Sequence, residues 1–231
     1  MTLLMLAALL ALGAMTGFLA GLFGIGGGMV MVPFLTLLLT AAGVPLDHVV
    51  HMAIATSLAT ILFTSLSSVR AHHQRGAVMW PVVKVLAPGI LIGSLLGAQV
   101  AAALPTALLA LLFAGFVGFS ATQMLLNRKP KPSRELPKAG GMFGVGNVIG
   151  LLSSLVGAGG GFISVPFMVW CNVTMHKAVA TSAALGFPIA AAGTVGYVIA
   201  GWRELGPPTW QNAGFIYLPA LAAITAMSVL T

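Results

Sequence analysis

Long apolar stretches with almost no charged side chains run through nearly the whole of this chain. Only 6% of its 231 residues are charged, whereas charged residues make up about a quarter of a soluble domain. Several stretches reach the roughly 20 residues with which a helix crosses the hydrocarbon core of a bilayer. A helix also satisfies its own backbone hydrogen bonds, as lipid requires. The sequence therefore predicts an all-α polytopic membrane protein.

Nine apolar segments are expected to be helical, and seven or more of them should span the membrane. They are residues 2–23, 29–39, 50–69, 81–103, 105–126, 139–156, 162–170, 178–200 and 214–231. Segments 29–39 and 162–170 are too short to span, because eleven helical residues rise only about 16 Å. Each of these two segments follows a glycine-dense break and should reach about half way across.

The two breaks belong to an internal repeat. The pattern G-x-G-G-G-x-x-x-V-P-F begins at Gly24 and again at Gly157, and a segment H-x-A-[IV]-A-T-S begins at His51 and again at His176. Ordered motifs that contain Pro, His and Thr-Ser do not align by chance in apolar sequence, so the chain is duplicated. We expect a first repeat over residues 1–127, a basic linker over 128–138 and a second repeat over 139–231, within one transmembrane domain.

The topology of the repeats depends on how each glycine break is used. If the chain turns back at the break, each repeat makes three net crossings and the copies are inverted. If the first segment spans once, each makes four crossings and the copies are parallel. The half-length segments favour re-entrant hairpins and inversion. The first repeat also predicts one more helix after the last segment, so we expect the second repeat to lack its final helix here.

Basic residues gather beside the expected spans, which argues for a topology signal and against nucleic-acid binding. The net charge is +7, and the positive-inside rule places short basic connections in the cytoplasm. The connections after the third and fifth segments should therefore be cytoplasmic; the basic residues in and around them are Arg70, Arg75, Lys84, Arg128, Lys129, Lys131, Arg134 and Lys138. The N-terminal segment has no basic region before it, so we interpret it as a retained helix.

The glycine breaks are the expected substrate site. Non-helical backbone at membrane depth is tolerated only inside protein or beside a watery cavity, and the half-helices that follow would point their positive ends into the breaks. This geometry suits an anion, although close helix packing by small residues is the competing interpretation. The predicted substrate-binding residues are Gly24, Gly26, Gly27, Gly28, Thr56, Ser57, Gly157, Gly159, Gly160, Gly161, Thr181 and Ser182.

Two equivalent histidines, His51 and His176, begin the helices that carry Thr-Ser. Either could relay a proton, and either could instead cap a helix at the membrane interface. The threonines and serines could likewise bond to their own helices. These alternatives stay open on sequence alone.

Some chemistries lack the residues they need. The carboxylates Asp47, Glu135 and Glu204 all lie in connections or near helix ends, so a cation path lined by buried acids is disfavoured, although backbone carbonyls could coordinate Na⁺. We find neither a hydrolase nucleophile motif nor a metalloprotease motif, and Cys171 is the only cysteine. We therefore expect no enzyme, no cofactor and no metal site.

The doubled glycine break with Val-Pro-Phe and the H-x-A-[IV]-A-T-S segments together resemble the TauE/SafE family of sulfite and organosulfonate exporters. The resemblance covers nearly the whole chain. It implies a multi-pass permease of the bacterial or archaeal inner membrane that moves small sulfur-containing anions such as sulfite or sulfoacetate. We expect a secondary transporter, an exporter, in which one repeat rocks against the other, with proton or Na⁺ coupling. A passive anion channel and a non-catalytic scaffold packed through glycine are the alternatives.

Overall fold

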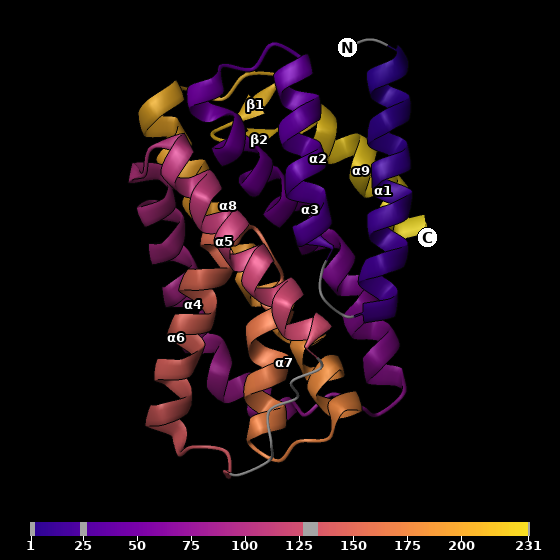
Figure 1. Cartoon of the computed structure of the whole chain (residues 1–231), viewed down its shortest axis with the longest axis vertical. Coiled ribbons are helices and arrows are strands. Elements are labelled where there is room, and N and C mark those ends of the chain that lie inside the picture. The colour runs from indigo at the N-terminus through magenta and orange to yellow at the C-terminus, as the bar shows by residue number, and fades with distance from the viewer. Residues whose placement is uncertain (1–2, 24–26, 127–133, 231) are drawn as a thin grey trace.

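The described part of the chain is almost entirely helical. The computed structural model describes residues 3–23, 27–126 and 134–230 (Figure 1). Their elements are α1 (Leu3–Phe23), α2 (Gly28–Ala41), α3 (Leu46–Gln74), α4 (Trp80–Ala103), α5 (Thr106–Leu125), α6 (Ala139–Val156), α7 (Gly161–Trp170), α8 (Met175–Leu205), β1 (Asn212–Ala213), β2 (Ile216–Tyr217) and α9 (Leu218–Leu230).

Five of the described helices are long and apolar enough to cross a bilayer, namely α3, α4, α5, α6 and α8. Helices α2 and α7 have 14 and 10 residues, so α7 is only about 15 Å long. The chain is thus an all-α polytopic membrane protein, as its composition predicts. The short second and seventh helices also lie where the sequence placed its half-length segments.

The connections divide between two opposite ends of the molecule. The N-terminal end of α1, the α2–α3 and α4–α5 connections and the β1–β2 hairpin lie at one end, whereas the α3–α4 and α7–α8 connections lie at the other (Figure 1). His48, in the first turn of α3, lies 3.6 Å from Glu204 near the last residue of α8. Helices α3 and α8 are therefore antiparallel. We call the end that holds the hairpin the hairpin end and the opposite end the basic end.

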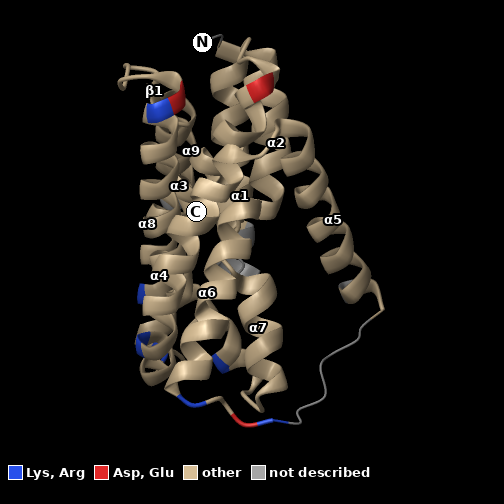
Figure 2. Cartoon of the chain, turned by 90° about the vertical axis from the view of Figure 1, so that its left-hand side faces the viewer, with Lys and Arg blue, Asp and Glu red and all other residues tan. Residues whose placement is uncertain are grey.

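Charged side chains distinguish these two ends. Lysines and arginines cluster at the basic end, and a single blue segment accompanies two red ones at the hairpin end (Figure 2). The residues at the hairpin end are Asp47, beside the start of α3, and Arg203 and Glu204, at the end of α8. Lys177 lies in the first turn of α8, at the basic end. Helix α5 leans away from the other helices in the same view and is mostly exposed.

Glycines allow the closest helix crossing, between α4 and α6. A Cβ atom at Gly89 or Gly93 would collide with backbone carbonyl oxygens of α6, and one at Gly146 would lie 2.5 Å from the Leu86 oxygen on α4. Small residues spaced four apart let two helical backbones approach in this way. Helix α9 packs on α1 with the same kind of contact, since a Cβ at Gly13 would lie 2.6 Å from the Ile224 oxygen. Each half of the chain therefore covers a helix of the other half.

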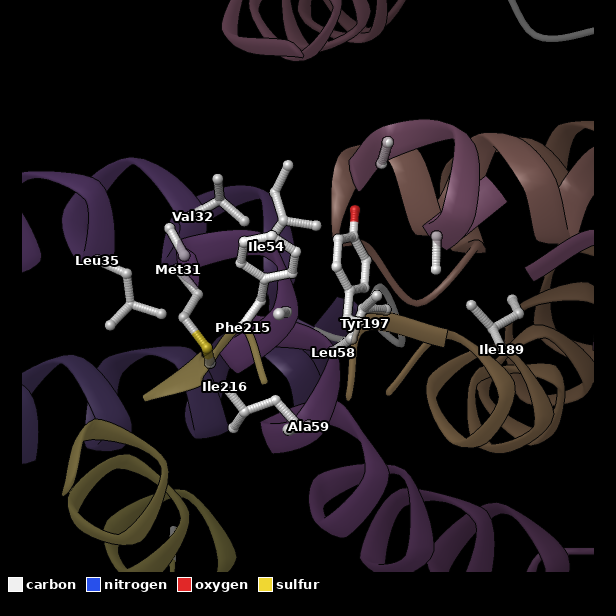
Figure 3. Packing of buried hydrophobic residues seen from close by; sticks show 14 of the residues in the cluster. Met31, Val32, Leu35, Ile54, Leu58, Ala59, Ile189, Tyr197, Phe215 and Ile216 are labelled. Atoms are coloured by element: carbon white, nitrogen blue, oxygen red, sulfur yellow. The ribbon is translucent and has the colours of Figure 1, made fainter. Parts of the chain in front are cut away.

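Buried side chains from segments distant in sequence pack against one another. Tyr197 of α8 stands edge-on to Phe215, with ring centroids 6.4 Å apart, and Ile54 of α3 lies beside them (Figure 3). The Tyr197 hydroxyl donates a hydrogen bond to the Ser154 carbonyl at 3.0 Å, which satisfies the one polar atom of this buried ring.

The last predicted helix is wrong at its start. Residues 214–217 belong to a two-stranded antiparallel hairpin in which Asn212 pairs with Tyr217, and α9 begins only at Leu218. Gly214 turns the chain with a φ of 61°, a left-handed conformation that glycine adopts without steric cost. Pro219, at the second position of α9, is the signal that could have placed the helix start.

Helix α3 extends beyond the apolar segment 50–69 at both ends. Its first turn includes Asp47 and its last turn includes His72 and His73. Polar residues at the ends of a spanning helix can continue the helix into the interfacial region, so hydropathy alone underestimates its length.

Candidate functional site

The first glycine break separates α1 from α2. Gly27 adopts a left-handed conformation, with a φ of 66°, directly before the first residue of α2. Its carbonyl accepts the amide hydrogens of Val30 and Met31 at 3.2 and 3.1 Å and so starts the helix. The predicted site residues Gly24 and Gly26 lie outside the described residues. Gly28 is buried.

The second break uses the same backbone device between α6 and α7. Gly157 ends α6 with a φ of 69°, and Gly160 precedes α7 with a φ of 76°. The Gly160 carbonyl accepts the amide hydrogens of Ile163 and Ser164 at 3.1 and 2.9 Å. Gly159 lies within the turn, and Gly161 is buried as the first residue of α7. Equivalent glycines thus start both short helices.

The two breaks touch each other. A Cβ atom at Gly28 would collide with the carbonyl oxygen of Gly157 and lie 2.9 Å from Cα of Ala158. Val32 of α2 and Ile54 of α3 border Gly157 from the other side, and both lie in the buried cluster of Figure 3. Segments more than 125 residues apart in sequence therefore form one central junction, which we call the glycine junction: residues 27–28 and 157–161.

Both short helices present uncapped amino ends at this junction. In the described chain neither Gly27 nor Gly160 provides a side-chain cap for the helix that follows. The first amide groups of a helix have no acceptor inside it, and the aligned peptide dipoles give that end a partial positive charge. The amino ends of α2 and α7 consequently favour negative charge, whereas the carboxyl end of α6 at Gly157 carries the opposite partial charge.

Of the two predicted serines, Ser57 bonds to the glycine junction directly and Ser182 reaches it through Ser164. Ser57 of α3 donates a hydrogen bond to the Gly157 carbonyl at 3.0 Å. Ser164 of α7 donates to the Gly160 carbonyl at 2.9 Å, and Ser164 and Ser182 lie 2.7 Å apart. Because Ser164 has a single hydroxyl hydrogen, Ser182 is the donor in that pair. All three serines are buried.

Ser164 was missed by sequence reasoning. It occupies one of the variable positions of the glycine motif, where the first copy has Met31. The available signal was a hydroxyl within an otherwise apolar half-helix.

The two predicted threonines make equivalent contacts at opposite sides of the junction. The Thr56 hydroxyl oxygen accepts the amide hydrogen of Tyr217 at 3.0 Å, just before α9. The Thr181 hydroxyl oxygen accepts the amide hydrogen of Met79 at 3.0 Å, just before α4. Each threonine therefore accepts a hydrogen bond from the residue directly before a helix of the other half of the chain.

The two predicted histidines occupy different surroundings. His51 is buried, and its Nε2 lies 3.1 Å from the Ala101 carbonyl and 3.0 Å from the Leu104 carbonyl at the end of α4. Both partners are acceptors, so Nε2 carries a hydrogen. The His51 ring stacks on Phe215 at 5.4 Å. His176 is exposed at the basic end, in the first turn of α8.

A cavity of about 750 Å³ opens at the hairpin end. Residues of α1, α2, the α2–α3 connection, α3, the end of α8 and the hairpin line it. Most of its lining is apolar, and its polar side chains include His48, Gln211 and Asn212. Tyr217 also lines the cavity, and its amide is the group bonded to Thr56. The cavity therefore ends close to one of the predicted substrate residues.

Comparison with known proteins identifies the family of this chain. The family profile described as sulfite exporter TauE/SafE matches residues 9–231. The chain belongs to the TauE/SafE family. This confirms the resemblance seen in the glycine and H-x-A-[IV]-A-T-S motifs, and it makes the chain a membrane transport protein.

Several relatives of the TauE/SafE chain carry transporter names. A "probable membrane transporter protein" of Haemophilus influenzae is 37% identical over 224 residues, which cover 96% of this chain and 84% of the relative. Probable membrane transporter protein YunE of Bacillus subtilis is 30% identical over 84% of this chain and 78% of the relative. Protein MJ0441 of Methanocaldococcus jannaschii, with the same description, is 27% identical over 99% and 84%. No solved structure matches the chain significantly.

Proposed function

We propose that this TauE/SafE chain is a secondary transporter that exports a small sulfur-containing anion, such as sulfite or an organosulfonate. The contact between Gly28 and Gly157 carries the proposal, because it brings the uncapped amino end of α2 against the glycine break that leads, three residues later, into the uncapped amino end of α7. An anion at that point would receive backbone N–H groups from both α2 and α7. A cation would meet the same partial positive charges unfavourably.

The hydroxyls around the glycine junction complete the proposed site. Ser57 and Ser182 now donate to protein acceptors, while the Thr56 and Thr181 oxygens accept backbone amides. An anion that entered would take the serine hydrogens in place of these partners. Exchange between comparable hydrogen bonds keeps binding modest, which a transported ligand needs in order to leave.

We also propose that the chain consists of two inverted repeats with re-entrant hairpins. Antiparallel α3 and α8 carry the two copies of H-x-A-[IV]-A-T-S, and the α1–α2 and α6–α7 hairpins open toward opposite ends (Figure 1). The clustering of lysine and arginine at the basic end supports a cytoplasmic location for that end in a bacterial or archaeal inner membrane (Figure 2). Rocking of one repeat against the other would then alternate access to the glycine junction.

Coupling to protons through His51 or His176 is a further part of the proposal, with Na⁺ as the alternative ion. The expected result for the double variant His51→Gln and His176→Gln is transport without its normal dependence on a pH gradient. Unchanged dependence would remove both histidines from the coupling mechanism.

Flux measurements in proteoliposomes test the proposed function directly. Wild-type protein should move one of sulfite, thiosulfate or sulfoacetate with saturation, and it should move sulfate and chloride less well. Ser57→Ala and Ser182→Ala should lower this flux by about tenfold, as expected when one buried hydrogen bond of about 1.4 kcal/mol is lost. Ser67→Ala is the matched control, because that serine bonds only within α3 to Thr64.

Each other outcome of this experiment has a distinct meaning. Flux that does not saturate and follows only the anion gradient would replace the transporter with a passive channel. Absence of flux for every anion, from protein shown to be folded, would favour another solute or a scaffold held together by glycine packing. Normal flux in both serine variants would contradict the proposed site.

A further inference from the structure

The cavity at the hairpin end contains an ionisable side chain that the glycine junction does not use. His48 lies in the first turn of α3 and lines the cavity wall, and a quarter of its side chain is exposed. Its ring packs against buried Phe215 at 6.0 Å between centroids. The imidazole is therefore positioned by the core while it remains accessible from the cavity.

One ring nitrogen of His48 is directed at a carboxylate. Nδ1 lies 3.6 Å from Oε1 of Glu204, and this buried nitrogen has no hydrogen-bond partner among the described residues. A protonated imidazole would interact favourably with the carboxylate at this distance. The other ring nitrogen would then also carry a hydrogen. A proton on His48 would therefore convert a neutral ring into a cation with an N–H donor on each nitrogen.

The other charged groups around His48 carry a net negative charge, which opposes anion binding until His48 is protonated. Asp47 precedes it on α3, and Arg203 and Glu204 lie at the end of α8. These three groups sum to −1 (−1 + 1 − 1), and a proton on His48 brings the total to 0. His51, one turn further along α3, is already bonded to the end of α4. The described cavity walls from α1, α2 and the hairpin add no charged side chain.

We propose that the cavity is a second anion-binding site, in which protonated His48 is the cationic ligand. The neutral amides of Gln211 and Asn212 line the same cavity and add N–H donors. The overall step is the uptake of one anion and one proton into the cavity, with no bond made other than N–H on His48. The inference deepens the proposed function, on which it rests, because it assigns the transported anion a docking place at the hairpin end.

The binding test uses methanesulfonate, which stays fully ionised across the pH range studied. Purified wild-type protein should be stabilised by this anion against thermal unfolding at pH 5.5 and much less at pH 8. His48→Gln should weaken binding at pH 5.5 by about tenfold or more, as expected for loss of a charge-assisted hydrogen bond. Binding to wild-type protein that is equal at both pH values, or absent at both, would overturn the proposal.

Two further variants separate this site from its surroundings. Glu204→Gln should strengthen methanesulfonate binding at pH 5.5, because it removes the negative charge that lies 3.6 Å from Nδ1 of His48 and competes with the anion for that ring. Glu204 is 44% exposed, so this change tests the pair even if His48→Gln fails to fold. His73→Gln, in the exposed last turn of α3 at the basic end, is the control and should bind as wild type does. Unchanged methanesulfonate binding at pH 5.5 in folded Glu204→Gln would exclude the pair.

Flux distinguishes a failure of this inference from a failure of the proposed function. Anion binding that depends on His48, in protein that moves no anion across liposomes, would keep the site and reject transport. Saturable anion transport that is unaffected by His48→Gln, together with unaffected binding, would keep transport and reject the site.

Discussion

Two threonines, Thr56 and Thr181, show how single hydroxyls join the halves of this molecule. Each accepts a backbone amide that precedes a helix of the other half, across 161 and 102 residues of sequence. Both threonines are fully buried. A buried amide that loses its acceptor costs more than an exposed one, because water cannot replace the partner.

Replacement of Thr56 by valine keeps the shape of the side chain and removes the acceptor for Tyr217. We expect Thr56→Val to destabilise the protein by about 1–2 kcal/mol, measured as a lower unfolding temperature in detergent. Thr60→Val is the control, since the Thr60 hydroxyl bonds only to the Thr56 carbonyl of its own helix. Equal unfolding temperatures for the two variants would argue against a stabilising role of the Thr56 contact.

The thiol of Cys171 is expected to be unreactive in the folded protein. It is buried at the connection between α7 and α8, and this burial raises its pKa, although nearby Arg134 acts in the opposite direction. Less thiolate is therefore present at neutral pH, and the thiolate is the nucleophile. Maleimide labelling at pH 7 should be about tenfold slower than for an exposed thiol and should accelerate as the pH rises.

Denaturation provides the control for that labelling. In detergent that unfolds the protein, Cys171 should react as fast as a free cysteine. Rapid labelling of folded protein at pH 7 would mean that the thiol is accessible and ionised.

Sequence reasoning could identify the residues of the junction but not their partners. The repeat in the sequence pairs Thr56 with Thr181 and Ser57 with Ser182. It could not show that Thr56 accepts from Tyr217, because that contact depends on how β2 returns to α3. Ser164 was missed for a related reason, since only its proximity to Ser182 distinguishes it from other residues of α7.

At the scale of elements, glycine spacing determines which helices lie closest together. Gly89 and Gly93 face the backbone of α6, whereas Gly118 of α5 has no heavy atom near the position of a Cβ. Gly93→Ala should therefore cost about 1–3 kcal/mol through overpacking of the α4–α6 crossing. Gly118→Ala should instead gain about 0.5–1 kcal/mol, since alanine favours a helix more than glycine does.

Unfolding temperature and the yield of monodisperse protein measure both effects. The pair is matched, because each change adds one methyl group to an apolar helix. A Gly93→Ala protein as stable as Gly118→Ala would show that α4 and α6 can separate without cost.

Runs of apolar residues predicted the order of these elements well and several of their boundaries poorly. Segments 81–103 and 139–156 coincide with α4 and α6 apart from one residue. The error at 214–217 arose because a short strand and the start of a buried helix have the same composition. Tertiary contacts fix the hairpin. The backbone at Gly214 packs so closely on α8 that a Cβ atom there would lie 2.6 Å from the Val198 carbonyl oxygen.

At the scale of the whole molecule, the two ends differ in charge and should face different compartments. We expect the basic end to be cytoplasmic. In a Cys171→Ala background, Gln211→Cys reports on the hairpin end and Glu135→Cys on the basic end, and both positions are exposed. A membrane-impermeant maleimide applied to intact cells should label the cysteine at 211 and spare the one at 135.

Permeabilised cells supply the control, because both cysteines should then react. Labelling of the cysteine at 135 in intact cells, with the one at 211 protected, would reverse the orientation and place His48 on the cytoplasmic side.

Helix α4 packs on α6 and α9 packs on α1, so each half of the chain covers a helix of the other half. This packing affects how such a protein could evolve and whether its two halves could fold separately. A chain that stopped after α5 would leave the glycine face of α4 uncovered in lipid, with its natural partner missing. On the proposed inverted repeat, a second copy of that half could cover this face only if it entered the bilayer upside down. The proposal then implies an ancestral half that inserted in both orientations, and separately expressed halves of the present protein should fold only when they are made together.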